Sequence, residues 1–337
     1  MGTIGTLLAH MTDSLEPPYA TPDAAPLSAA DASDLARSLV ENVETVIVGN
    51  RSAIEHIVTA VLAGGHLLLE DVPGVGKTML ARAVARSVDG DFSRVQFTPD
   101  LLPADVTGSH VFNEKTREFD FQPGPIFGNV VLGDEINRAP PKTQAALLEA
   151  MEEGQVTVDG TTHPLPDPFT VIATQNAVER DRTYELPVAE VDRFTKKLHL
   201  GYPSPDEEVA VIERAVGDHP IDSVDAVASV ADLRRARATA ASVTVAEPVR
   251  EYVTRLSGYT REHASLGVSP RGSIALVRAA QGRATLDGRE YVTPDDVKAE
   301  APSVLAHRIR ADPGGAVGGE AGERIVEQAL SRVDPEA

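Results

Sequence analysis

The sequence contains no cysteine, which excludes disulfide bonds, thiolate metal sites and cysteine nucleophiles. Long apolar runs are missing too. The longest one, residues 57–69, is too short to span a bilayer and is interrupted by Gly64, Gly65 and His66. No lysine or arginine precedes Arg37, so the charged start of a secretory signal is not expected. These absences predict a soluble cytoplasmic protein.

Positive charge is also scarce. The 337 residues include 31 Lys and Arg against 51 Asp and Glu, which gives a formal net charge of −20. Only six of the 31 basic residues are lysine. Tight sequence-independent binding of nucleic acid requires a basic face, so this class of function is disfavoured. A strongly acidic surface is typical of proteins from a high-salt, halophile-like cytoplasm, where salt screens self-repulsion. An ordinary acidic protein is the alternative.

The chain length, and the change along the chain from alternating strands and helices to helices alone, predict one large and one smaller domain. Residues 1–32 are rich in Pro, Ala, Thr and Ser and are expected to form a disordered tail. An α/β core is expected over 33–201 and an α-helical domain over 202–310. The glycine-rich remainder, 311–337, is expected to be a flexible tail with one possible helix.

The spacing of the apolar residues predicts where the helices and strands of these parts lie. Strands are predicted at 67–69, 95–97, 130–133 and 169–174, and helices from 31, over 52–62 and over 144–153. Polar hairpins are predicted at about 110–122 and 154–164, the second closed by Asp159-Gly160, a pair favoured in type I′ turns. Five helices without a convincing strand follow, at about 206–215, 231–241, 247–264, 271–286 and 294–307.

A glycine-rich turn joins the 67–69 strand to a helical pattern, which is the context of a phosphate-binding loop. Its backbone N–H groups and the helix N-terminus would hold anionic oxygens. Lys77 would reach the β- and γ-phosphates of ATP, and the Thr78 hydroxyl would bind Mg²⁺. One position departs from the full pattern, because Asp71 stands where glycine is expected. The predicted nucleotide-binding residues here are Pro73, Gly74, Val75, Gly76, Lys77, Thr78 and Met79.

A pair of carboxylates, Asp134 and Glu135, ends the buried strand 130–133. The first carboxylate can support the Mg²⁺ shell, and the second can orient and deprotonate a water molecule. A strand-end turn would explain the pair alone. Its position some sixty residues after Lys77-Thr78 favours an ATP-hydrolysing site instead.

Seven segments in one order resemble the MoxR family of AAA+ ATPases, over roughly residues 33–310. They are EDVPGVGKT (70–78), QFTPDLLPADVTG (96–108), GDEINRAPPKTQAALLEAMEE (133–153), ATQN (173–176), DRF (192–194), SPR (269–271) and VLAHR (304–308). The resemblance implies a P-loop core with a parallel sheet flanked by helices, followed by a small α-helical lid. It also implies that Asp71 is tolerated.

The resemblance assigns further residues to the site. Asp134 would support the metal through water, and Glu135 would act as general base. Asn176 matches the polar sensor that positions the attacking water. Val48 and Gly49 fall where the adenine pocket begins. The implied cofactors are ATP and Mg²⁺.

Two arginines complete the implied site. Arg271 matches a sensor arginine that reaches the nucleotide, and Arg193 resembles an arginine finger donated to the neighbouring subunit. Arg180 and Arg182 compete for the finger role, because the family's glycine-containing turn is absent there. A finger acting in trans implies a homo-oligomer, by resemblance a hexameric ring.

The function implied by the resemblance is chaperone-like remodelling, maturation or metal-cofactor insertion of protein clients. Partners with a von Willebrand factor A domain are implied as well. The two hairpins match insertions that face the ring pore or a partner. The alternatives are a helicase-like or clamp-loader-like motor on nucleic acid, which the net charge of −20 disfavours, and a nucleotide-dependent scaffold without turnover.

Overall fold

The computed structural model describes residues 25–72, 74–176, 184, 186–215, 221, 224–312 and 317–335. Most of the predicted N-terminal tail, Pro73, Arg180 and Arg182 therefore lie outside the described residues. Within this part of the chain, no helix is long and apolar enough to cross a membrane.

A five-stranded parallel sheet forms the centre of the α/β part, in the order β10-β1-β9-β6-β3. The strands are β1 (Leu67–Asp71), β3 (Phe92–Gln96), β6 (Val130–Asp134), β9 (Thr170–Asn176) and β10 (Lys196–Leu198). The predicted α/β fold class is confirmed. Of these five strands only β10 is not predicted by the pattern, because two of its three residues are lysine.

Helices cover both faces of this sheet, as a fully parallel sheet requires. Successive residues of β1 point to opposite faces: Leu67 and Leu69 belong to one apolar cluster, and Leu68 belongs to another. The first cluster contains residues of α2 (Ala29–Glu44), α3 (Arg51–Leu62), α4 (Lys77–Ser87) and α9 (Val230–Ser242), and the second of α5 (Pro103–Thr107) and α6 (Pro141–Glu153).

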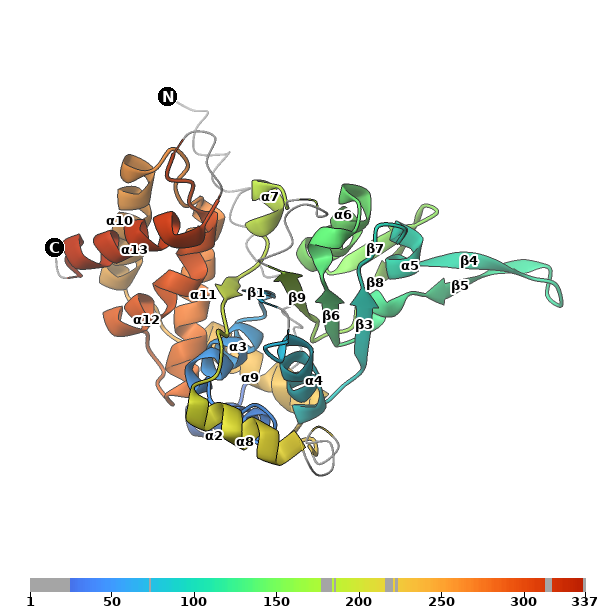
Figure 1. Ribbon diagram of the computed structural model, residues 1–337, viewed down its shortest axis with the longest axis horizontal. Helices are drawn as coiled ribbons and strands as arrows, with labels where there is room; N and C mark the ends of the chain where they lie inside the picture. The colour runs from blue at the N-terminus through green and yellow to red at the C-terminus, as the bar shows by residue number, and fades with distance from the viewer. Residues whose placement is uncertain are drawn as a thin grey trace.

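Two antiparallel hairpins extend from this core. They are β4–β5 (Gly108–Asn113 with Glu118–Pro123) and β7–β8 (Gln155–Val158 with Thr161–Pro164). Asp159 and Gly160 both have positive φ, 51° and 82°, as a type I′ turn requires, so the turn prediction is confirmed. The β4–β5 hairpin projects as a long arm away from the helical part (Figure 1).

The helical part packs around its own apolar cluster, which draws on α10 (Glu247–His263), α11 (Pro270–Leu286), α12 (Pro294–Leu305) and α13 (Gly319–Arg332). The possible helix in the C-terminal segment is thus present as α13. Its residues Ile325, Val326 and Ala329 are buried in this cluster, which corrects the expectation that the segment is loosely held. The predicted absence of strands after residue 205 is also wrong in one place, since β11 (Ala228–Ser229) pairs with β2 (Val88–Asp89). The remaining elements are α7 (Val188–Val191), α8 (Pro205–Ala215), η1 (Pro125–Phe127), η2 (Ile136–Arg138) and η4 (Ala306–Arg308).

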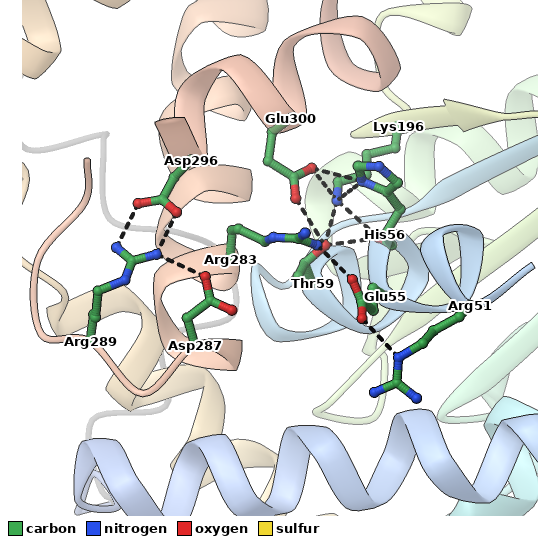
Figure 2. A network of polar contacts seen from close by, with 10 residues as sticks. All are labelled: Arg51, Glu55, His56, Thr59, Lys196, Arg283, Asp287, Arg289, Asp296 and Glu300. Atoms are coloured by element: carbon green, nitrogen blue, oxygen red, sulfur yellow. Dashed lines mark hydrogen bonds and ion pairs between the residues drawn. The ribbon is translucent and has the colours of Figure 1, made fainter. Parts of the chain in front are cut away.

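A buried ionic network joins the two parts (Figure 2). Lys196 Nζ of β10 lies 2.5 Å from Glu300 Oε2 of α12, and neither side chain is exposed. His56 Nδ1 of α3 lies 3.1 Å from the same oxygen. Burial raises the pKa of Glu300, but Lys196 and His56 outweigh it and lower this pKa to about 2. The ionised carboxylate thus attaches the helical part directly to β10, the edge strand of the sheet.

Candidate nucleotide site

The phosphate-binding loop lies between β1 and α4, as predicted. Gly74 and Gly76 have φ values of 86° and 91°, and no atom lies within 4 Å of where a Cβ would stand. Glycine is therefore required here by backbone conformation and not by lack of space. Val75 and Met79 pack against the apolar cluster beneath the loop. This leaves the backbone N–H groups and the N-terminus of α4 available for an anion.

Lys77 is held at the base of this loop. Its Nζ donates to three backbone carbonyls, those of Asp71 at 2.6 Å, Val72 at 3.2 Å and Gln175 at 3.2 Å. Burial lowers the pKa of Lys77, and nearby carboxylates, Asp71 first, partly oppose that shift. Three carbonyl acceptors match the three donors of an ammonium group.

Asp71 has a role that the loop pattern did not predict. One oxygen, Oδ2, accepts hydrogen bonds from the backbone N–H groups of Leu200 at 2.6 Å and Gly201 at 2.8 Å. The other oxygen, Oδ1, accepts from the N–H of Val72 at 2.9 Å. The buried carboxylate thus connects the entrance of the loop to the chain that leaves β10, a contact that glycine could not make.

Asp134 lies beside Thr78 at the end of β6. Its Oδ2 accepts from Thr78 Oγ1 at 3.2 Å and from Arg94 Nη2 at 2.6 Å, and its Oδ1 accepts from Thr174 Oγ1 at 2.6 Å. The described residues hold no cluster of three or more His, Cys, Asp or Glu suited to a metal. A hydroxyl beside one carboxylate nonetheless fits Mg²⁺, which takes most of its ligands in such sites from phosphates and water.

Glu135 occupies an unusual backbone conformation, with φ of 57° and ψ of 49°. Such conformations cost energy for a non-glycine residue and cluster at functional sites. Its N–H donates to Thr174 Oγ1 at 2.9 Å, so one hydroxyl orients both acidic residues. Its Oε2 accepts from Gln96 Nε2 and Arg138 Nη1, each at 2.8 Å. The carboxylate is thereby held at the carboxyl edge of the sheet.

These groups line one cleft of about 420 Å³. Asn176 lines it too, next to the loop, because its strand pairs in register with Asp71. The structure thus brings together most of the predicted loop and strand-end residues. The full lining is Gly74, Gly76, Lys77, Thr78, Met79, Arg94, Gln96, Asp134, Glu135, Thr174, Gln175 and Asn176.

Four residues of this cleft are missed by the sequence reasoning: Arg94, Gln96, Thr174 and Gln175. One signal was present for Thr174, since it stands two residues before Asn176 on a strand and therefore shares its face. Arg94 and Gln96 are likewise two residues apart on β3, so their side chains share one face of that strand. Nothing local links β3 to the acidic pair, because the contact exists only through strand pairing.

Val48 and Gly49 do not line this cleft. Gly49 has a φ of 72°, and a Cβ on it would overlap the Glu207 carboxylate near the start of α8. The two residues therefore lie where the chain between α2 and α3 meets α8. Their assignment to an adenine pocket stays a prediction.

Arg193 and Arg271 are also absent from the lining, and both contact Glu152 at the end of α6. Arg193 Nε lies 3.1 Å from Glu152 Oε2, an ion pair without hydrogen-bond alignment. Arg271 Nη2 donates to Glu152 Oε1. Arg271 therefore does not line the cleft, and its role as a sensor arginine that reaches the nucleotide stays a prediction.

Comparisons with known proteins agree with this geometry. Residues 66–196 match the model of the ATPase family associated with various cellular activities (AAA), and residues 258–329 match the AAA lid domain. The lid match extends into α13. Both matched regions correspond to parts that the structure shows as separately packed.

Relatives are similar over nearly the whole chain. "Uncharacterized protein YeaC" of Bacillus subtilis is 51% identical, over 90% of this chain and 95% of its own. "Chaperone MoxR1" of Mycobacterium tuberculosis is 42% identical, over 86% of this chain and 79% of its own. A crystal structure of a candidate ATPase from Cytophaga hutchinsonii superposes with a TM-score of 0.82 at 37% identity, covering 91% of this chain and 96% of that one.

Proposed function

Because this chain belongs to the MoxR family of AAA+ ATPases, we propose that it couples Mg²⁺-dependent ATP hydrolysis in a homo-oligomeric ring to the remodelling of other proteins. The relative named a chaperone supports the choice of protein clients. Maturation or metal-cofactor insertion, and a partner with a von Willebrand factor A domain, belong to the same proposal. A hexamer in the cytoplasm is its expected form.

One observation supports the proposed assembly of subunits into a ring. The cleft contains a phosphate loop, a metal-supporting carboxylate and a candidate base, but its only lining arginine, within the described residues, is Arg94, which is paired with Asp134. Arg193 and Arg271 lie together at Glu152 and away from that lining. Two arginines gathered on one part of the surface suit delivery to the cleft of a neighbouring subunit.

The residues of the cleft have separate roles in this proposal. Lys77 and the loop N–H groups bind the phosphates, and Thr78 with Asp134 would hold Mg²⁺, which neutralises the charge of the transferred phosphoryl group. Glu135 accepts the proton of the attacking water, and Asn176 orients that water. Gln96 and Arg138 keep the Glu135 carboxylate in place.

The β4–β5 arm favours protein clients over nucleic acid. Phe112 and Phe119 on this hairpin are 50% and 68% exposed, and their rings are 5.3 Å apart. The arm carries two basic and three acidic residues, so it offers no electrostatic attraction for a phosphate backbone. An exposed apolar pair of this kind suits an exposed apolar segment of a client protein.

Mixed rings test the trans arrangement. Lys77→Ala subunits should not bind ATP but would still donate Arg193, whereas Arg193→Ala subunits bind ATP but donate no finger. We expect each variant alone to release little phosphate and their mixture to recover activity. A mixture as inactive as its components would contradict the trans role. Stimulation of hydrolysis by DNA, and not by an unfolded protein, would favour the nucleic-acid alternative.

A further inference from the structure

Arg308, at the end of η4, is a buried arginine that no role described so far uses. Its side chain is 3% exposed. Nε donates to Asp192 Oδ1 at 2.7 Å, while Nη2 donates to the backbone carbonyls of Asp192 at 3.1 Å and Phe194 at 2.7 Å. Nη1 donates to the carbonyl of Thr195 at 3.3 Å. One guanidinium therefore binds both sides of Arg193.

Neighbouring residues reinforce this attachment. Ser269 Oγ donates to the other oxygen of Asp192 at 3.1 Å, and His307 Nε2 lies 3.2 Å from the carbonyl of Phe194. Burial lowers the pKa of Arg308 to about 10, against the opposing effect of Asp192, so the group stays charged at neutral pH. The segment 192–195 is thus fixed by the helical part and not only by its own fold.

Arg308 also lies against the start of α11, which carries Arg271. A Cβ on Gly272 would stand 2.8 Å from Arg308 Cδ and 3.2 Å from its Nε. The glycine directly after Arg271 therefore leaves the space through which the Arg308 side chain passes. The same side chain contacts both segments whose arginines meet at Glu152.

Simple attachment of the helical part does not explain this geometry. Lys196 and Glu300 already join the two parts, and Arg289 with Asp296 forms a partly buried ion pair within the helical part (Figure 2). Arg308 differs because three of its four hydrogen bonds to segment 192–195 end on backbone carbonyls. Such contacts fix the path of the backbone, which sets where the Arg193 side chain begins.

We propose that Arg308 is a positioning residue that holds Arg193 and Arg271 in one unit, so that both enter the neighbouring subunit's cleft together. This rests on the proposed trans role of Arg193. Arg308 thus acts in the subunit that donates the arginines, and not in the subunit that holds the nucleotide. A lysine in its place keeps the charge but loses the planar fork that reaches several acceptors.

Mixed rings separate these two locations. The acceptor carries Arg193→Ala and the donor carries Lys77→Ala, and phosphate release is measured at a fixed ratio of the two. Adding Arg308→Lys to the donor should lower the recovered rate about 10–100-fold, since a misplaced catalytic group loses rate of this order. Adding Arg308→Lys to the acceptor should leave most of the recovery. The KM for ATP should stay the same in both mixtures.

Control variants distinguish a loss of the positioning role from a general loss of structure. Arg289→Lys in the donor should leave recovery intact, because that arginine lies in the same helical part but contacts Asp287 and Asp296 instead. Asp192→Ala in the donor removes the carboxylate that accepts from Arg308 Nε and should lower recovery without removing Arg308. Ring size and thermal melting of each variant show whether it folds.

Each result has one meaning. Full recovery with an Arg308→Lys donor, or equal loss when the substitution is in the acceptor, would overturn the positioning role while leaving the trans finger standing. No recovery even with the unmodified pair of Lys77→Ala and Arg193→Ala would overturn the trans finger itself. The two failures are therefore distinguishable.

Discussion

The nucleotide cleft and the arginine cluster around Glu152 are built in different ways. The cleft collects residues from the carboxyl ends of adjacent strands and from the loop after β1, and its groups contact one another within a single chain. The cluster collects residues from α6, the segment before β10, and the start of α11. Under the proposed trans arrangement, the first region binds the nucleotide within one subunit, whereas the second acts on the nucleotide of a neighbouring subunit.

This difference separates binding from chemical activation. If the catalytic arginine comes from a neighbouring subunit as proposed, a single subunit would bind ATP but hydrolyse it slowly, and the rate would depend on assembly. The helical part contacts β10 through Glu300 and Lys196, and it holds the segment of Arg193 through Arg308 and Asp192. Changes in the two regions should therefore have different kinetic effects.

The largest effect is expected from the cluster. Arg193→Ala should lower kcat for ATP about 10³-fold with little change in nucleotide affinity, because the arginine would stabilise charge only in the transition state. Arg250→Ala on the exposed surface of α10 is the matched control. Steady-state phosphate release and equilibrium nucleotide binding measure the two quantities. A loss of affinity equal to the loss of rate would remove the distinction between the regions.

The next effect belongs to the cleft. Glu135→Gln should lower hydrolysis about 10²–10³-fold while ATP binding persists, because the amide cannot accept the proton of the attacking water. Glu149→Gln, an exposed carboxylate on α6, should hydrolyse like the unchanged protein. Single-turnover hydrolysis with bound ATP isolates this step. Normal turnover by Glu135→Gln would exclude its role as the base.

A smaller effect, on the free energy of unfolding, tests how Asp71 holds the phosphate loop in place. Asp71→Gly restores the residue expected from the phosphate-loop pattern but removes the acceptor of the Leu200 and Gly201 N–H groups. We expect it to lower the free energy of unfolding by about 3 kcal/mol, because buried donors lose a charged partner. Urea unfolding measures this loss, and Asp71→Asn, which keeps one oxygen, should lose less. A glycine variant of unchanged stability would contradict the proposed contact.

The smallest effect depends on pH and concerns the buried side chain of His66. His66 Nδ1 accepts from the N–H of Val171 at 3.0 Å, and burial lowers the pKa of His66 to about 4. The folded protein therefore keeps this ring neutral. Its stabilising contribution is complete above the unfolded pKa of about 6.5 and declines as the pH falls toward 4. From pH 7 to pH 5 the loss should be about 2 kcal/mol.

His66→Gln provides the comparison for this pH effect. The variant should be less stable at pH 7 but should lose less stability between pH 7 and pH 5, as measured by urea unfolding at each pH. His263→Gln on α10, whose ring is exposed, should follow the unchanged protein. Parallel curves for His66→Gln and the unchanged protein would rule out a contribution from this histidine.

Much of the fold follows from local sequence patterns. The strands β1, β6 and β9 are apolar runs that end in polar residues, and the two hairpins carry their own turn residues, so each is specified within a few positions. Strand β10 has no such pattern, because Lys196 is buried only through its pairing with Glu300 of α12. Helix α13 is similar, since its glycine-rich approach suggests a loose tail until its apolar face meets the cluster of α10–α12.

The sequence by itself determined the phosphate loop and the acidic pair at the end of β6, because each is a short run of neighbouring residues. It also determined the family, because seven such short segments follow one another in the family's order. Only the tertiary structure decided where the arginines lie. Asp192 and Arg308 are 116 residues apart in the chain and meet through the packing of the helical part on β10. Contacts of that kind depend on burial and strand order, which no local pattern contains.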